Sequence, residues 1–151
     1  MNIDLDNIRN FFRKDRFATE NGMVIDSVTE DCAVCSMELD ARHRNSLGGV
    51  QGGAIFTLAD LAFGVHSNLA MLCGENVGAT VGQSCSISFL KGTRGRRLIA
   101  KSTRLSQGRS VSVYRIRVED DLGSLIAEML ANGFTQNGGL KTEKSMTDTP
   151  K

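Results

Sequence analysis

The residues that could carry chemistry in this chain gather between positions 45 and 60. Two adjacent glycines, Gly52 and Gly53, open a segment that is apolar on nearly every side except at Asp60. A helix that is apolar all round is normally buried, and a carboxylate within it is costly unless it is paired, hydrogen-bonded or protonated. Such a carboxylate usually faces a cavity and takes part in a reaction. A structural aspartate tied to a neighbouring backbone group or arginine is the alternative.

Size and charge narrow the classes of protein to which the chain can belong. With 151 residues it is expected to form one domain with a real core. Its 18 basic and 17 acidic residues nearly balance, so no nucleic-acid or membrane partner is expected. Neither a basic start followed by an apolar run nor a stretch of 18 apolar residues occurs, which favours a cytoplasmic protein.

The four cysteines are expected to bind no metal and to form no disulfide. Cys32 and Cys35 have the spacing of a zinc knuckle, but no second pair of ligands accompanies them. Their segment also reads as a strand, where positions three apart point to opposite faces. We interpret both as small, buried residues.

The elements that must position Asp60 and the glycines follow from periodicity and turn residues. A short amphipathic helix is expected over 4–16, a loop over 40–49 and a long buried helix over about 52–72. Strands are expected over 23–28, 32–39, 78–91, 97–106, 109–119 and 123–135. This order predicts an α+β fold in which an antiparallel sheet of six strands wraps around the long helix. The corresponding division is an N-terminal helical segment over 1–20, one domain over 21–135 and a flexible tail over 136–151.

A family resemblance emerges from these residues. The run from His43 through Asn45 to Gln51-Gly52-Gly53, followed by Thr57-Leu58-Ala59-Asp60, resembles the H-x-N-x-x-G-x-x-H-G-G…tLaD signature of hotdog-fold acyl-CoA thioesterases, in their phenylacetate-degradation (PaaI-type) branch. Segments 86–90, 94–100, 106–109 and 123–127 resemble later family strands and turns, so the resemblance spans roughly residues 20 to 135.

The resemblance implies a thioester hydrolase whose substrate contains coenzyme A and which needs no further cofactor. Tetrahedral oxyanions need preorganised donors, and the N–H groups at a helix start provide them. Gly52 is the candidate oxyanion donor, with Gly53 beside it, although simple steric passage between helix and sheet also explains both glycines. Asn45 is expected to hold the attacking water or the thioester oxygen, or else to cap a loop turn.

Asp60 would serve as general base or as nucleophile. It follows Gly52 by about 12 Å of helix, at 1.5 Å per residue. The resemblance implies that the glycine turn of one subunit meets the carboxylate of another, in an obligate homodimer. Two such dimers are expected to form a homotetramer.

The chain departs from the family signature at two positions. The usual histidine before the paired glycines is Gln51, which can hydrogen-bond but has no titratable group. The strand position that often carries Ser or Thr opposite the carboxylate falls on Gly82. Because side chains alternate along a strand, Thr80 and Ser84 are expected on the same face and would supply the support.

Contacts to the coenzyme A portion are expected at the ends of strands. By resemblance, Phe89, Lys91 and the turn Gln107-Gly108-Arg109-Ser110 would contact the substrate; a solvated basic edge is the alternative. A hydratase of the same fold, with a histidine five residues after its aspartate, is disfavoured because His66 follows Asp60 by six. His66 is expected on a helix face or at the dimer contact, and His43 in a loop. A non-catalytic acyl-CoA-binding module is the competing function, motivated by Gln51 and Gly82.

Overall fold

The computed structural model describes residues 1–136, and the expected tail beyond them lies outside the described part. Six strands form one sheet, β1 (Met23–Val28), β2 (Ala33–Glu38), β3 (Thr80–Phe89), β4 (Arg97–Gln107), β5 (Val111–Asp120) and β6 (Leu125–Thr135). Their order across the sheet is β1-β2-β4-β5-β6-β3, and every neighbouring pair is antiparallel. The predicted α+β hotdog fold is confirmed.

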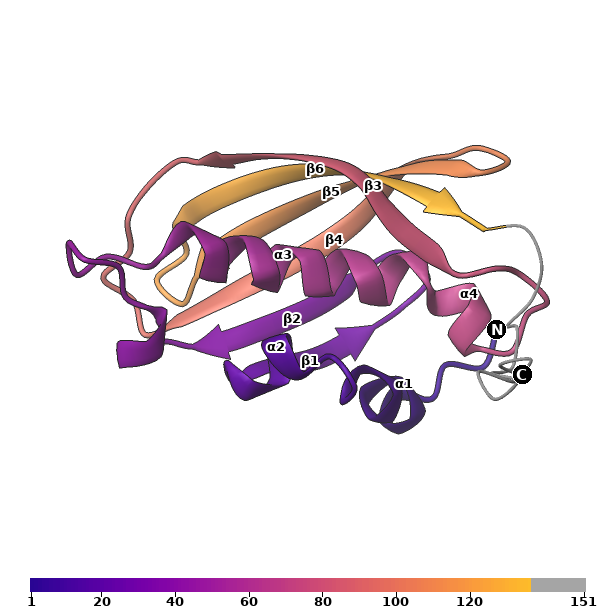
Figure 1. Cartoon of the computed structure of the whole chain (residues 1–151), viewed down its shortest axis with the longest axis horizontal. Coiled ribbons are helices and arrows are strands. Elements are labelled where there is room, and N and C mark those ends of the chain that lie inside the picture. Colours follow the sequence, from indigo (N-terminus) through magenta and orange to yellow (C-terminus); the bar gives the residue numbers. More distant parts are fainter. Residues whose placement is uncertain (137–151) are drawn as a thin grey trace, which may run out of the picture.

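Helix α3 (Gly52–Ser67) runs along one face of this sheet (Figure 1). Its buried residues include Leu58, Ala62 and Val65, which pack against buried strand residues such as Met37 and Ile116. This burial supplies the main apolar core. The helix therefore holds its N-terminal glycines and Asp60 in a fixed relation to the sheet.

The long helix predicted over 52–72 is interrupted at Asn68, after which α4 (Leu69–Leu72) begins. The Asn68 side chain donates to the carbonyls of Gly64 and Thr80 at 2.9 and 3.0 Å, and its Oδ1 accepts from the Thr80 N–H at 2.8 Å. Side chains of this type compete with the helix for backbone partners. Asn68 thus fixes the end of α3 to the start of β3.

The single N-terminal helix predicted over 4–16 is instead two short helices, α1 (Leu5–Phe12) and α2 (Arg16–Glu20). Asp15 caps the second, because its side chain accepts from the Ala18 N–H at 3.1 Å. Both helices lie next to β1 (Figure 1). A short 3-10 turn, η1 (Ala41–His43), leads into the loop before α3. In the described part of the chain, no helix has the length and apolar character needed to cross a membrane.

Candidate active site

Gly52 lies in the wall of a cavity of about 570 Å³ at the N-terminal end of α3. This cavity brings together four of the residues predicted from the sequence, Asn45, Gly52, Phe89 and Lys91. The remaining lining residues were not predicted and come from α3, from β6 and from the loops around them: Gly49, Val50, Ile55, Leu90, Gly92, Thr93 and Ile126.

The first turn of α3 leaves two adjacent amides without an acceptor. Ala54 and Ile55 donate to the carbonyl of Gln51 at 3.0 and 3.3 Å, whereas the N–H groups of Gly52 and Gly53 donate to no group in residues 1–136. A helix start also carries partial positive charge. A Cβ at Gly52 would lie 3.2 Å from the Phe89 ring, so the close approach of helix and strand also favours glycine at this position. The arrangement can bind an anionic oxygen.

Asn45 both closes its loop and lines the cavity. Its Oδ1 accepts from the N–H groups of Leu47 and Gly49, each at 3.0 Å. Since this oxygen is committed to two donors, the amide Nδ2 is the group left for a ligand. The two sequence interpretations of Asn45, a turn cap and a cavity donor, therefore describe different atoms of one side chain.

Gln51 is the N-cap of α3. Its Oε1 accepts from the Ala54 N–H at 3.0 Å, and its side chain is exposed outside the lining of the cavity. The oxygen lies where a Cβ on Gly53 would come within 2.6 Å. Thus the residue replacing the family histidine organises the helix start in this structure.

Asp60 lies on the one stripe of α3 that the chain does not cover. Along this stripe Gly53 and Asp60 are exposed. Thr57, which lies between them, and Gly64, one turn after Asp60, are half-buried. The expectation that Asp60 is enclosed in a buried helix is therefore wrong for the single chain. Loss of hydration beside the helix nevertheless raises the pKa of Asp60, and the negative charge of Asp15 raises it further.

A bulge in β3 changes which residues face this stripe. The register with β6 shifts between Gly82 and Ser84, so that Ser84 pairs with Asn132 and accepts from its Nδ2 at 2.8 Å. Asn132 alternates with the buried Ala131 and Gly133, which places Ser84 on the outer face of the sheet. The prediction that Ser84 shares a face with Thr80 and Gly82 is wrong, whereas Thr80 and Gly82, paired with Thr135 and Gly133, do lie on one face.

Cys85 instead points to the side of the sheet that faces α3. It pairs with the fully buried Ala131, and cross-strand partners share a face. Although Cys85 is exposed in the single chain, partial loss of hydration raises the pKa of its thiol, and the nearby charge of Asp60 raises it further. Sequence reasoning missed this neighbour of Asp60, because a bulge leaves no signal in strict alternation.

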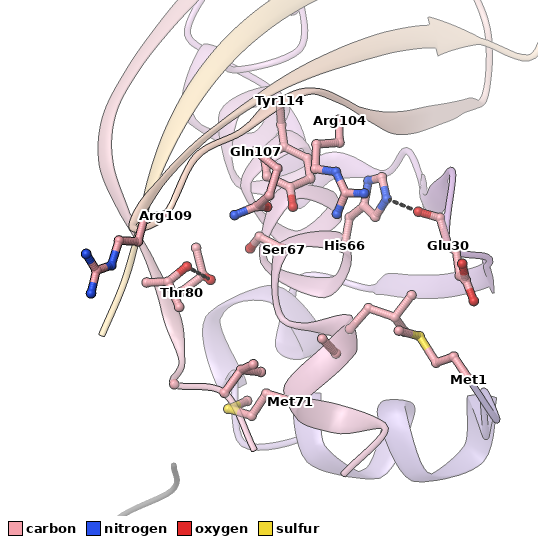
Figure 2. Close-up of a pocket in the computed structure, with 15 residues that line it drawn as sticks. Met1, Glu30, His66, Ser67, Met71, Thr80, Arg104, Gln107, Arg109 and Tyr114 are labelled. Carbon is pink, nitrogen blue, oxygen red and sulfur yellow. Dashed lines mark hydrogen bonds between the residues drawn. The ribbon is translucent and has the colours of Figure 1, made fainter. Parts of the chain in front are cut away.

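The residues predicted to contact coenzyme A separate into two groups. Gln107 and Arg109 line a second cavity, of about 290 Å³, at the opposite end of α3, together with Thr80 (Figure 2). Thr80 is buried and bonds to the Thr135 hydroxyl at 2.8 Å. The turn itself is held by Gly108, whose N–H donates to the carbonyl of Val111, and by the Ser110 carbonyl, which accepts from the Thr135 N–H. Lys91 lies at the first cavity.

The loop that carries Lys91 is organised by Asp120, which is 5% exposed. Its carboxylate accepts from the Thr93 hydroxyl at 2.6 Å and from the Ser124 N–H at 2.8 Å, and these bonds lower the pKa of Asp120. Lys91 Nζ donates to Ser124 Oγ at 3.2 Å. The lysine is therefore placed at the cavity mouth and keeps its charge exposed.

Both histidines are buried. His66 lies on α3, as expected, is 4% exposed, and its ring contacts Ser102 Oγ and the Glu30 carbonyl in the interior of the chain. His43, expected as a loop residue, ends the η1 turn and is 1% exposed. The four cysteines are free, and within residues 1–136 no cluster of metal-binding side chains occurs.

Comparison with known proteins places this geometry in a family. Residues 47–127 match the sequence profile of the Thioesterase superfamily. Over 122 residues the chain is 31% identical to the acyl-coenzyme A thioesterase PaaI of Escherichia coli, covering 80% of this chain and 83% of that one. The structure of E. coli PaaI superposes with a TM-score of 0.78 at 27% identity, covering 89% and 94% of the two chains. A Streptococcus mutans protein bound to acetyl CoA shares the fold, with a TM-score of 0.69 at 22% identity over 79% and 92%.

Proposed function

Since the chain belongs to the thioesterase superfamily, we propose that it hydrolyses an acyl-CoA thioester to the free acid and coenzyme A. The observation that carries this proposal is the pair of N–H groups at Gly52 and Gly53, which have no acceptor within residues 1–136, together with the Asn45 amide that lines the same cavity as Gly52. Attack of water on a thioester carbonyl creates an oxyanion, which such fixed donors stabilise. The likeness to a named acyl-CoA thioesterase supports the choice of substrate class.

In the proposed reaction the Gly52 N–H receives the developing oxyanion. Asn45 Nδ2 donates a second hydrogen bond, to the thioester oxygen or to the attacking water. Because these donors are already held by the helix and by the 45–49 loop, little reorganisation is required as charge develops. Removal of one such donor typically costs about a hundredfold or more in kcat.

Asp60 supplies the base or the nucleophile. As a base it takes a proton from the water that attacks the thioester carbonyl. As a nucleophile it attacks that carbonyl itself and expels the coenzyme A thiolate, and water then hydrolyses the resulting mixed anhydride to the free acid and the regenerated carboxylate. Its raised pKa suits the general-base route, because a more basic carboxylate accepts a proton more readily. About 12 Å of helix separates it from Gly52 of the same chain, so a second copy must complete the site.

The two edges of the sheet differ in a way that favours pairing through β3. At the β1 edge, Arg9 Nε donates to the Ile25 carbonyl at 3.0 Å, and α1 and α2 pack nearby. The β3 edge spans ten residues, of which all but Thr80 and Ile87 are exposed. Long bare edges invite pairing with another strand. In our proposal two copies join antiparallel along β3, beside the uncovered stripe of α3 that bears Asp60.

The same pairing unites the two groups of coenzyme A contacts. Lys91 and Phe89 lie just beyond and at the end of β3, whereas Gln107 and Arg109 lie near its start. Antiparallel pairing places the end of one strand beside the start of the other. The nucleotide phosphates would then meet basic side chains from both copies.

The deciding experiment measures release of coenzyme A with a thiol-reactive dye. The panel comprises phenylacetyl-, hydroxybenzoyl-, acetyl-, hexanoyl- and palmitoyl-CoA, with the native chain beside Asp60→Ala and Asn45→Ala. We expect turnover in the native chain and its loss in both variants, with their melting temperatures and oligomeric state retained. Binding of acyl-CoA without any turnover would instead identify the non-catalytic binding module.

A further inference from the structure

A buried histidine stands at the base of the loop that carries Asn45. The ring of His43 makes two hydrogen bonds to backbone groups: Nε2 lies 2.7 Å from the Asn21 carbonyl, and Nδ1 accepts from the Asp40 N–H at 3.1 Å. A carbonyl only accepts and an N–H only donates, so in these two bonds Nε2 is the donor and Nδ1 the acceptor. Neither nitrogen is left for proton transfer.

The backbone of His43 extends this attachment to the start of α3. Its carbonyl accepts from the Gln51 N–H at 2.8 Å, and the Asn45 N–H donates to the Gly49 carbonyl, also at 2.8 Å. An isolated bridge joins Arg44 to Val50 between these two bonds. His43 therefore fixes both ends of the loop between η1 and α3, and Asn45 and Gly52, which line the cavity, lie at those two ends.

We propose that His43 is a positioning residue, which sets the geometry between the Asn45 amide and the Gly52 N–H by anchoring their loop to the α2–β1 turn. Its role rests on the proposed thioesterase function, and it acts through those two groups without contacting the substrate. The anchor is the Nε2–H bond to Asn21, reinforced by the Arg42 guanidinium, which donates to the neighbouring Glu20 carbonyl. Displacement of such donors by about 1 Å costs up to about a hundredfold in rate.

His66 provides a matched control for loss of a buried, hydrogen-bonded ring when activity is measured with an acyl-pantetheine, which lacks the nucleotide, because the ring also lines the second cavity with Gln107 and Arg109. It is 4% exposed and contacts Ser102 Oγ at 3.2 Å. It also contacts the Glu30 carbonyl at 3.0 Å (Figure 2). It follows Gly52 by fourteen residues, which is about 21 Å of helix. Substitution of either histidine removes comparable packing and comparable hydrogen bonds. A purely structural contribution would therefore lower the melting temperature in both cases and leave kcat per folded protein unchanged.

Two conservative substitutions separate the two ring bonds. Glutamine carries an NH₂ group close to the position of Nε2, so His43→Gln retains the donor to Asn21. Asparagine carries a carbonyl close to the position of Nδ1, so His43→Asn retains only the acceptor for Asp40. We expect kcat to fall about tenfold to a hundredfold in His43→Asn with KM within about twofold, because the lost geometry matters only in the transition state.

In His43→Gln we expect kcat within about threefold of the native value. With an acyl-pantetheine as substrate, which does not reach the second cavity, we expect native kcat in His66→Gln and His66→Asn despite lowered melting temperatures, since these variants keep the Asn21 anchor. Native kcat in His43→Asn, an equal kcat loss in the His66 variants, or a large loss in a folded His43→Gln would each overturn the proposal. The His43→Gln arm decides the matter if His43→Asn does not fold.

Amide hydrogen exchange separates failure of this inference from failure of the proposed function. If the native chain hydrolyses no acyl-CoA, the thioesterase proposal fails, yet the anchoring role is still open to measurement. We expect faster exchange across residues 44–52 in His43→Asn and native protection of those amides in His43→Gln and His66→Asn. Unchanged protection of this loop in folded His43→Asn contradicts the anchor.

Discussion

Arg109 and Lys91 lie at opposite ends of strand β3. Arg109 shares a cavity with Thr80, the first residue of the strand, and Lys91 follows Phe89, the last. Ten residues of strand span roughly 33 Å. Within one chain these two cations therefore reach different parts of the surface. Only association of two copies would allow both to contact a single nucleotide, which makes the quaternary arrangement the first matter to test.

A mixture of two inactive variants tests whether the site is shared between subunits. We expect Asp60→Asn and Asn45→Asp to be inactive alone; aspartate at position 45 keeps an acceptor for Leu47 and Gly49 but loses the donor. After joint refolding, half of the dimers are mixed and each holds one intact site. Activity should then return to about a quarter of the native value, given random pairing in a twofold dimer.

The measurement is CoA release before and after mixing, with chain exchange followed by mass spectrometry. A mixture of each variant with itself is the control. Absence of recovery despite verified exchange would show that Asp60 and Asn45 act within the same chain.

Removal of the basic side chains should weaken binding of the nucleotide end. We expect Lys91→Ala and Arg109→Ala to raise KM for acyl-CoA by about fivefold each, because an exposed ion pair contributes up to about 1 kcal/mol. Arg117→Ala, on the exposed face of β5, is the control and should leave KM unchanged. Acyl-pantetheine lacks the nucleotide, so with that substrate the Lys91 and Arg109 effects should disappear. Equal effects on KM for both substrates would show that Lys91 and Arg109 do not contact the nucleotide.

The acid limb of the pH profile should depend on Asp15. A carboxylate base acts unprotonated, so kcat/KM falls as the pH drops through its pKa. Desolvation and the charge of Asp15 both raise the pKa of Asp60, so this fall should begin above the range of an ordinary aspartate, about 3.9.

Asp15→Asn removes the charge while asparagine still caps α2, so the limb should move to lower pH. Asp6→Asn, on the exposed α1, should leave the profile in place. If the acid limb stays in place in Asp15→Asn, the charge of Asp15 does not raise the pKa of the catalytic base.

Substitutions at Gln51 distinguish a cap from a catalytic group. Gln51→Ala should lower the free energy of unfolding by about 0.5–2 kcal/mol, because the Ala54 N–H loses its side-chain acceptor. Serine is a strong N-cap, so Gln51→Ser should retain stability and, if Gln51 only organises the helix start, kcat as well. Denaturant titration and CoA release measure the two quantities separately. A stable Gln51→Ser variant with a large loss of kcat would assign the amide to the reaction itself.

Most of the fold follows from local patterns. The Gly- and Asp-containing turns separate strands of alternating burial, and β5 reads this way along most of its length. The points at which helices are interrupted are less predictable. Asn68 ends α3 because its amide hydrogen-bonds to Thr80 in a distant strand. Asp15 divides the N-terminal helix by capping α2. The partner of Asn68 is distant in the sequence, so its position cannot be read locally. The Asp15 side chain bonds to a backbone N–H that a continuous helix would use equally well, so the break there has no clear sequence signal.

The candidate site divides in the same way. The order of residue types from Asn45 to Gly53 was sufficient to predict that Asn45 and Gly52 lie together at the start of the long helix, because a helix start and its loop are local structures. The role of Asp60 stays a prediction. Ser84 was assigned to the wrong face, since the bulge after Gly82 depends on pairing with β6. The burial of His43 and His66 likewise comes from contacts with Asn21, Glu30 and Ser102.

By itself, the sequence therefore determined which groups are present and the turn that exposes the glycine amides. The tertiary structure alone decided that Cys85 faces Asp60's helix, that Asn45 Oδ1 is committed to its loop and that the β3 edge stays bare. The physical reason is the range of the interactions. Helix starts and turns depend on neighbours within about five residues, whereas strand register, burial and the desolvation that raises the pKa of Asp60 depend on which distant segments pack together.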